Sequence, residues 1–228
     1  MKKMKLVSVL IIGLLTFNCQ SKDTNKKNEK ETQKNNSITA SKEKEVTQNL
    51  EQYETAYFAS GCFWCVEAIF ESVKGVKEVV SGYSGGTKPN PTYEEVSSGD
   101  TDYAEAVKIY YDPKIISYAD LVLLFFGSHD PTTLNQQGPD RGTQYRSIAF
   151  YKTEKEKKEV EDFIKKLRSD KVYGDKTIVT EVQKFTKFYN AEEYHQNYES
   201  LHPNNSYIMN VSTPRITKFK NKFPNYLK

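Results

Sequence analysis

The chain has 228 residues, enough for one good-sized domain, and 37% of them are hydrophobic. Its formal net charge is only +3, and the second part of the chain has no dense basic block. The sequence therefore gives no specific support for nucleic-acid binding. The first fifty residues differ in composition from the rest of the chain.

Residues 1–19 have the layout of a signal peptide. Lysines at positions 2, 3 and 5 precede an apolar stretch over 6–17, which is shorter than the roughly twenty residues of a membrane-spanning helix. Thr16-Phe17-Asn18-Cys19 resembles the cleavage box of bacterial lipoproteins. We therefore expect a lipid on Cys19, with secretion and an unmodified terminus as the alternative.

Residues 20–52 are rich in Lys, Asn, Glu, Thr and Ser and nearly free of apolar side chains. Such a segment cannot bury enough apolar surface to fold, so we expect a disordered polar tether. A lipid on Cys19 would then hold the rest of the protein near a membrane. This predicts a location in the bacterial cell envelope, in the periplasm or at a membrane surface.

The first half of the expected domain, residues 53–212, alternates strands with helices. The pattern predicts strands at 53–59, 76–83 and 104–111, and helices at 62–73, 90–96 and 118–126, the last with Ser117 as its N-cap. Residues 127–144 form a Gly- and Pro-containing loop, and loops of that length inside a domain are usually functional.

The second half continues with a strand at 146–151 and a charged helix from Thr153 to about 169. A strand follows at 177–183, and Asn190 with Glu193 can cap a last short helix to about 201. Residues 213–228 show little pattern and are expected to be a C-terminal tail. Mixed short strands and helices predict a single α+β domain, a mixed β-sheet with helices packed against it.

Gly61-Cys62-Phe63-Trp64-Cys65 stands where the first strand gives way to a helix. Unpaired N–H groups and the dipole at a helix start favour an anion, so we expect a lowered pKa and a reactive thiolate at Cys62. Cys65 lies one turn further on, within reach of a disulfide. Two buried structural cysteines are the alternative. A loop this small constrains little, however, which favours a redox pair.

Gly61-Cys62-Phe63-Trp64 followed by Glu67 resembles the signature of the A-type peptide methionine sulfoxide reductases. Six further stretches occur in the order of that family, at residues 81–86, 90–93, 104–107, 129–132, 142–147 and 194–196. The resemblance covers about 57–207. A lone C-x-x-C would be a weak signal, whereas this many ordered motifs is a specific one.

The resemblance implies a two-layer α+β sandwich around a mixed sheet and reduction of the S epimer of methionine sulfoxide, free or within proteins. It also implies site residues, with Cys62 as nucleophile, Phe63 and Trp64 around the substrate methyl group, Tyr93, Glu105 and Tyr145 binding and protonating the sulfoxide oxygen, and Asp140 as a nearby acid. The chemistry asks for the same types, because a carboxyl kept neutral by burial can supply a proton beside phenol donors. By periodicity alone Glu105 would be an exposed strand residue, and the tyrosines ordinary core or surface residues.

The family's usual resolving cysteines are absent. Their places are taken by Ser97 and by Ile208 after Tyr207, whereas Cys65 replaces a glycine common at the fourth place of the motif. The resemblance therefore implies a Cys62–Cys65 disulfide, recycled by an external thioredoxin-like dithiol and without metal or organic cofactor. We expect a monomer.

Two other functions share some of these residues. A thiol-disulfide oxidoreductase would use the C-x-x-C but needs neither Glu105 nor the tyrosines. A metal-binding lipoprotein would use Cys62 and Cys65 with His195 and His202, but the two histidines are further apart than in usual zinc sites. We expect no fusion with the B-type reductase, because the sequence after Tyr207 is short for that domain.

Overall fold

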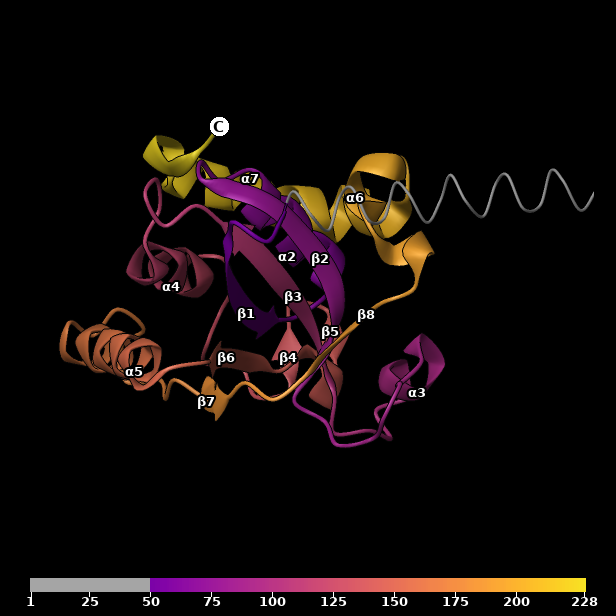
Figure 1. Ribbon diagram of the computed structural model, residues 1–228, viewed down its shortest axis with the longest axis horizontal. Helices are drawn as coiled ribbons and strands as arrows, with labels where there is room; N and C mark the ends of the chain where they lie inside the picture. Colours follow the sequence, from indigo (N-terminus) through magenta and orange to yellow (C-terminus); the bar gives the residue numbers. More distant parts are fainter. Residues whose placement is uncertain (1–49) are drawn as a thin grey trace, which may run out of the picture. The chain divides into compact units, whose positions relative to one another are not determined.

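The computed structural model describes residues 50–228 (Figure 1). The expected signal peptide, the lipid site at Cys19 and most of the tether lie outside the described residues. The centre of the fold is a six-stranded sheet in the order β7-β6-β1-β3-β2-β8. Its strands are β1 (Glu54–Ser60), β2 (Val76–Ser84), β3 (Ala104–Tyr111), β6 (Ser147–Tyr151), β7 (Glu181–Lys184) and β8 (Phe188–Asn190). Only β6 and β7 pair in parallel, so the predicted α+β domain with a mixed sheet is confirmed.

The helices are α2 (Phe63–Glu71), α3 (Tyr93–Ser97), α4 (Tyr118–Gly127), α5 (Glu154–Ser169), α6 (Tyr198–Leu201) and α7 (Thr213–Lys222). Three of them begin with a capping box, in which Thr92, Ser117 or Thr153 accepts from a backbone N–H one turn later. The caps predicted at Ser117 and Thr153 are therefore confirmed. Because a capping box uses only residues within one turn, it marks the start of a helix in the local sequence.

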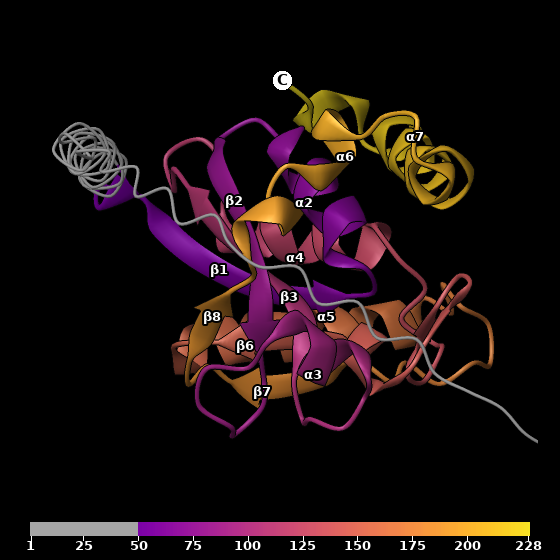
Figure 2. The same ribbon diagram turned by 90° about the vertical axis from the view of Figure 1, so that its right-hand side faces the viewer.

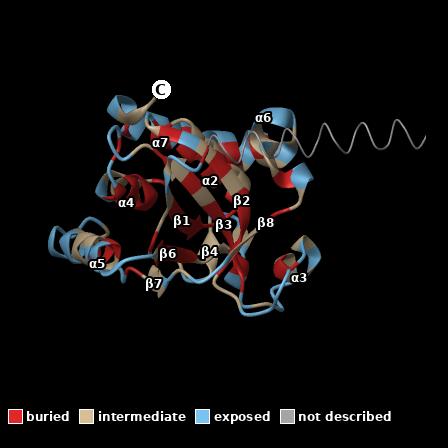
Figure 3. Ribbon diagram, viewed as in Figure 1, coloured by how far each residue is buried: buried red, intermediate tan, exposed pale blue. Residues whose placement is uncertain are grey.

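Strand β1 lies between β3 and β6 and is buried on both faces. Because successive side chains alternate, Ala56 and Phe58 face the core with α2 and α4, whereas Tyr57 and Ala59 face the opposite side. There Tyr57 stacks on Phe185, with ring centroids 3.8 Å apart. Helix α2 packs between the sheet and α7 (Figure 2), and buried residues concentrate on the central strands and inner helices (Figure 3).

The predicted elements differ from the structure mainly after residue 127. The loop at 127–144 contains a small hairpin, β4 (Gln136–Gln137) with β5 (Asp140–Arg141), and runs into the 3-10 turn Thr143–Tyr145. Asn190 ends strand β8 and caps no helix. The helix expected up to residue 201 is broken into the turn Glu193–His195 and α6, because Asn197 between them has a left-handed backbone with φ 54°.

Residues 213–228 belong to the domain, so the expectation of a C-terminal tail is wrong. A π-helical turn (Ile208–Ser212) leads into α7 and a final 3-10 turn, Pro224–Tyr226. Ile216 and Phe219 of α7 are buried, and Leu227 forms a β-bridge with Val73 at the end of α2. This helix is hard to predict from the sequence, because its few apolar residues lie among lysines and form only a short amphipathic pattern.

We expect Phe219→Ala to lower the free energy of unfolding by about 3–5 kcal/mol, because it removes a fully buried ring and leaves a cavity. Chemical denaturation followed by circular dichroism measures this loss. Thr217→Ala on the exposed side of α7 is the matched control and should stay within about 0.5 kcal/mol of wild type. Equal stability of the two variants would show that α7 is not part of the cooperative fold.

Candidate active site

Gly61 and Cys62 turn the chain from β1 into α2. Gly61 has φ +88°, which favours glycine, and a Cβ there would meet Gln137 Cβ at 2.6 Å. Cys62 is the N-cap of α2, and Cys65 lies in its first turn. Both cysteines are buried and both are free thiols. The junction predicted from the sequence therefore brings the two sulfurs together inside the protein.

The charge of this dithiol lies on Cys65, and the expectation of a lowered pKa at Cys62 is wrong. Burial raises the pKa of Cys62 well above its ordinary value, and its hydrogen bond to Cys65 and the nearby Glu105 act in the same direction. The same hydrogen bond lowers the pKa of Cys65 to about 6, with help from the charge of Arg215. The two sulfurs thus share one proton, with Cys62 as the donor.

The free N–H groups at the start of α2 were expected to stabilise a Cys62 thiolate. One of them instead binds the carboxyl group of Glu105 on β3. The N–H of Phe63, the first residue of α2, donates to Glu105 Oε2 at 3.0 Å. Burial raises the pKa of Glu105 to about 8, while the bond from Phe63 opposes this rise. Only 2% of the residue is exposed. Glu105 is thus a buried carboxyl that is mostly protonated at neutral pH, as the sequence analysis required.

Two phenols, both expected at the site, lie near this carboxyl. Tyr93 starts α3, and Tyr145 ends the 3-10 turn before β6. Burial raises the pKa of Tyr93 to about 12, and the charges of Glu105 and Cys62 add to the rise. The pKa of Tyr145 is raised by burial and then by the same two groups. Each phenol therefore keeps its proton and lies close enough to Cys62 and Glu105 to be influenced by their charges.

Phe63 and Trp64 form an aromatic wall beside these groups. Phe63 is buried against Tyr83 and His195, with ring centroids 6.0 and 5.0 Å away. The half-buried Trp64 stacks on Tyr198 at 3.8 Å and donates its indole N–H to His195 Nδ1 at 3.1 Å. His195 is thus a packed histidine that orients Trp64.

Asp140, the last of the predicted residues, reaches the dithiol through a residue to which the sequence analysis gave no role. The hydroxyl of Tyr207 donates to Asp140 Oδ2 at 2.5 Å and also lies within hydrogen-bonding reach of both cysteines. Burial raises the pKa of Asp140, against the effect of the bond from Tyr207. Tyr207 is the last residue of the range that the family resemblance covers, and this resemblance is the one signal that could have found it.

A second carboxyl, Glu67 on α2, ties three segments together. It accepts hydrogen bonds from the hydroxyl of Ser81 on β2 and, at 2.6 Å, from the backbone N–H of Asn197. Burial raises the pKa of Glu67 to about 7, against the effect of these bonds. Its place under the aromatic wall is structural, because it positions the segment that carries His195 and Tyr198.

The contribution of Glu67 and Glu105 to the free energy of unfolding is expected to fall as the pH rises from about 4.5 to 8. Glu67 and Glu105 have raised pKa values in the folded protein, so their stabilising protons are fully held below the unfolded pKa and lost as the pH passes about 7 and 8. Glu67→Gln should remove on the order of 3 kcal/mol of this fall, measured by urea denaturation at several pH values. The exposed Glu94→Gln is the control, and an unchanged slope in Glu67→Gln would contradict the raised pKa.

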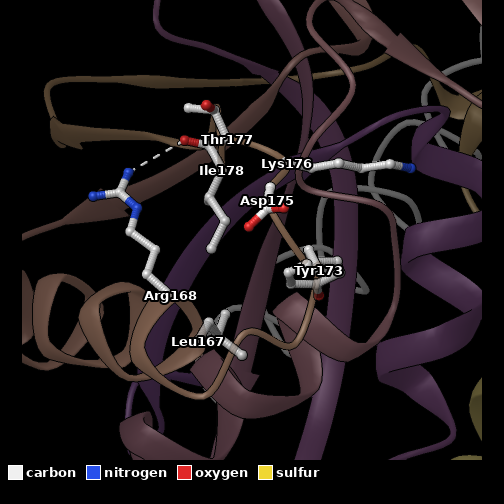
Figure 4. Close-up of a pocket in the computed structure, with 8 residues that line it drawn as sticks. Leu167, Arg168, Tyr173, Asp175, Lys176, Thr177 and Ile178 are labelled. Atoms are coloured by element: carbon white, nitrogen blue, oxygen red, sulfur yellow. Dashed lines mark hydrogen bonds between the residues drawn. The ribbon is translucent and has the colours of Figure 1, made fainter.

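Two cavities stand out among the described residues. One, of about 220 Å³, lies behind the end of α5, where Arg168 donates to the carbonyl of Ile178, and contains no residue of the site (Figure 4). The other has about 600 Å³ and is lined by Asp140, Tyr207 and Arg215, among others. The second cavity therefore adjoins the dithiol from the side of α7.

The fold and the site together define a thiol-dependent oxidoreductase, with a buried dithiol beside a protonated carboxyl and two phenols. The chain belongs to the peptide methionine sulfoxide reductase family, whose profile matches residues 54–227. It is therefore an enzyme that acts on methionine sulfoxide.

Relatives from distant organisms support this assignment. A protein of Polynucleobacter asymbioticus named peptide methionine sulfoxide reductase MsrA is 46% identical over 176 residues, covering 77% of this chain and 92% of that protein. Its namesake in Sulfolobus acidocaldarius is 49% identical over 171 residues, covering 75% and 96%. The crystal structure of reduced Mxr1 from Saccharomyces cerevisiae matches with a TM-score of 0.63 at 36% identity, covering 68% of this chain and 88% of that one.

Neither metal ligands nor a membrane span stands out in residues 50–228. No group of three or more His, Cys, Asp or Glu side chains there could hold a metal ion. No helix in the same range combines the length and the apolar character needed to cross a bilayer.

Proposed function

We propose that the enzyme reduces the S epimer of methionine sulfoxide, free or within proteins, with Cys62 as nucleophile and Cys65 as resolving cysteine. The observation that carries this proposal is the position of Cys62. Cys62 lies near a protonated carboxyl, Glu105, and two phenols, and it is hydrogen-bonded to Cys65.

The substrate would bind with its methyl group against Phe63 and Trp64 and its oxygen toward Tyr93, Tyr145 and Glu105. Apolar rings suit the methyl group, and phenol O–H groups suit a sulfoxide oxygen, which is a strong acceptor. This orientation presents the sulfur of the substrate to Cys62. Buried donors held in advance are worth more than donors in water, because they need no reorganisation when charge develops.

In the first step Cys62 passes its proton to the Cys65 thiolate and its sulfur attacks that of the sulfoxide. The sulfoxide oxygen takes the proton of Glu105 as its bond to the substrate sulfur breaks. The oxygen, freed as hydroxide, then attacks the Cys62 sulfur, so that an S–O bond forms there and the S–S bond to the substrate breaks. Methionine is released and Cys62 is left as a sulfenic acid. Burial keeps Glu105 in the protonated form that this step needs up to about pH 8.

In the second step Cys65 condenses with the sulfenic acid to give a Cys62–Cys65 disulfide and water. A thioredoxin-like dithiol would then restore both thiols by exchange. We also propose that a lipid on Cys19 and the segment that follows hold this activity at the cell envelope. Mass analysis of the mature N-terminus tests the lipid, and an unmodified Cys19 would exclude this anchor.

A single turnover without reductant tests the proposed chemistry. The domain is mixed with S-methionine sulfoxide, and methionine and free thiols are counted before and after. We expect one methionine per protein and the loss of both thiols. No methionine with both thiols intact would overturn the proposal, and turnover of the R epimer would overturn its stereochemistry.

Disulfide exchange is the rival function, since a C-x-x-C with one low pKa is also typical of dithiol oxidoreductases. Reduction of insulin disulfides at a rate similar to that of sulfoxide reduction would favour it. The buried Glu105 argues against it, because thiol exchange has no oxygen to protonate.

A further inference from the structure

The C-terminal helix α7 supplies a cation to the dithiol that the proposed chemistry has not used. Arg215 donates from Nε to the carbonyl of Ser128 at 2.9 Å and from Nη2 to the carbonyl of Ser60 at 2.8 Å. Ser60 and Gly61 lead directly into Cys62, and a Cβ on Gly61 would lie 3.4 Å from Arg215 Nη1. The guanidinium is thus fixed against the backbone that leads into the dithiol.

The segment before α7 contributes a second polar group on the same side. Ser212 ends the π-helical turn and is completely buried. Among residues 50–228 no group meets the geometry of a hydrogen bond with its hydroxyl, but the hydroxyl lies close enough to Cys65 to lower the pKa of that thiol. Ser212 and Arg215 are three residues apart, so they share a helix face, and π-helical turns frequently occur at functional sites.

We propose that Arg215 is a positioning residue for the resolving step, holding Cys65 as a thiolate against Cys62. This inference rests on the proposed function and extends it. Cys65 is not exposed at all, and a buried anion needs a compensating charge. Only one of the described groups that interact electrostatically or by hydrogen bonds with Cys65 is a cation, namely Arg215. The others are Cys62, Glu105, Tyr207 and Ser212.

The resolving step is the one that needs this anion. The Cys65 thiolate attacks the sulfur of the Cys62 sulfenic acid, so that an S–S bond forms and the S–O bond breaks. Cys65 must first give up the proton that it took from Cys62, and the hydroxide that leaves takes up this proton and becomes water. Because the thiolate is the nucleophile, losing the cation should slow this step at low pH and spare it where Cys65 is ionised without help.

The first measurement titrates Cys65 alone, by thiolate absorbance near 240 nm in a Cys19→Ser, Cys62→Ser background, which leaves Cys65 as the one thiol of the sequence. We expect Arg215→Met to move the titration midpoint up by about one pH unit or more, as for loss of a nearby opposite charge. Arg215→Lys should keep most of the wild-type behaviour. Lys220→Met removes an exposed cation from the same helix and should leave the midpoint unchanged.

The second measurement follows methionine and disulfide separately after a single turnover, in protein with both cysteines. With Arg215→Met we expect disulfide formation to slow about fivefold at pH 6 and to match wild type at pH 8.5, since the thiolate fraction follows the titration. An unmoved midpoint, or equal slowing at both pH values, would overturn the inference and leave Arg215 a structural role. Wild-type protein that forms no methionine would overturn the proposed function instead, and the titration would still test Arg215.

Discussion

Replacing Cys62 by serine abolishes methionine formation, with a rate expected to fall by about 10⁴-fold or more, because a hydroxyl cannot supply the sulfur nucleophile. Replacing Cys65 by serine has a different result. One methionine still forms per protein, about tenfold more slowly since the thiolate that accepts the proton of Cys62 is lost. The reaction then stops with a sulfenic acid on Cys62, which mass spectrometry detects as a dimedone adduct.

The two serine variants control for each other. Both remove one buried thiol from the same turn of α2, so a general packing effect would lower both activities alike. A Cys62→Ser variant that still made methionine, or a Cys65→Ser variant that made none while Cys62→Ser did, would reverse the roles. That reversal deserves a direct test, because the resting charge of the pair lies on Cys65.

The parts of the fold that were predictable depend on local sequence. The alternating pattern at 104–111 predicts strand β3 with the bounds that the structure has. Capping residues predict the starts of α4 and α5. The elements that were missed depend on distant partners. Strand β8 is three residues long and exists because it pairs with β2, more than a hundred positions earlier in the chain. Helix α7 is stabilised by the core that its two buried apolar residues join.

The site shows the same division. The family pattern placed Cys62, Glu105 and the phenols together, and the structure brings them together. The pKa of Cys62 could not be predicted from its place at a helix start, because the Phe63 N–H is taken by Glu105, 42 residues away, and burial outweighs the dipole. Nothing in the sequence marks Arg215, since its role depends on how α7 packs against α2.

Replacing Glu105 by glutamine is expected to slow methionine formation by about 10²- to 10⁴-fold, the usual worth of a positioned general acid. The amide keeps the size of the side chain and can still accept the hydrogen bond from Phe63, so the start of α2 is preserved. What it loses is the proton for the departing oxygen. Rapid-quench measurement of methionine in the first turnover isolates this step from resolution and recycling.

Glu67→Gln is the matched control, because it changes another buried carboxyl with a raised pKa, whose hydrogen bonds come from Ser81 and Asn197. It should leave the rate of the first step within about threefold of wild type.

The pH profile gives a second test of Glu105 as the general acid. A general acid must be protonated, so wild-type activity should fall as the pH rises through about 8, the raised pKa of Glu105. This alkaline limb should vanish in Glu105→Gln. If the limb survives the substitution, the proton comes from another group, and Tyr93, whose pKa is raised only to about 12, could not produce a limb near pH 8.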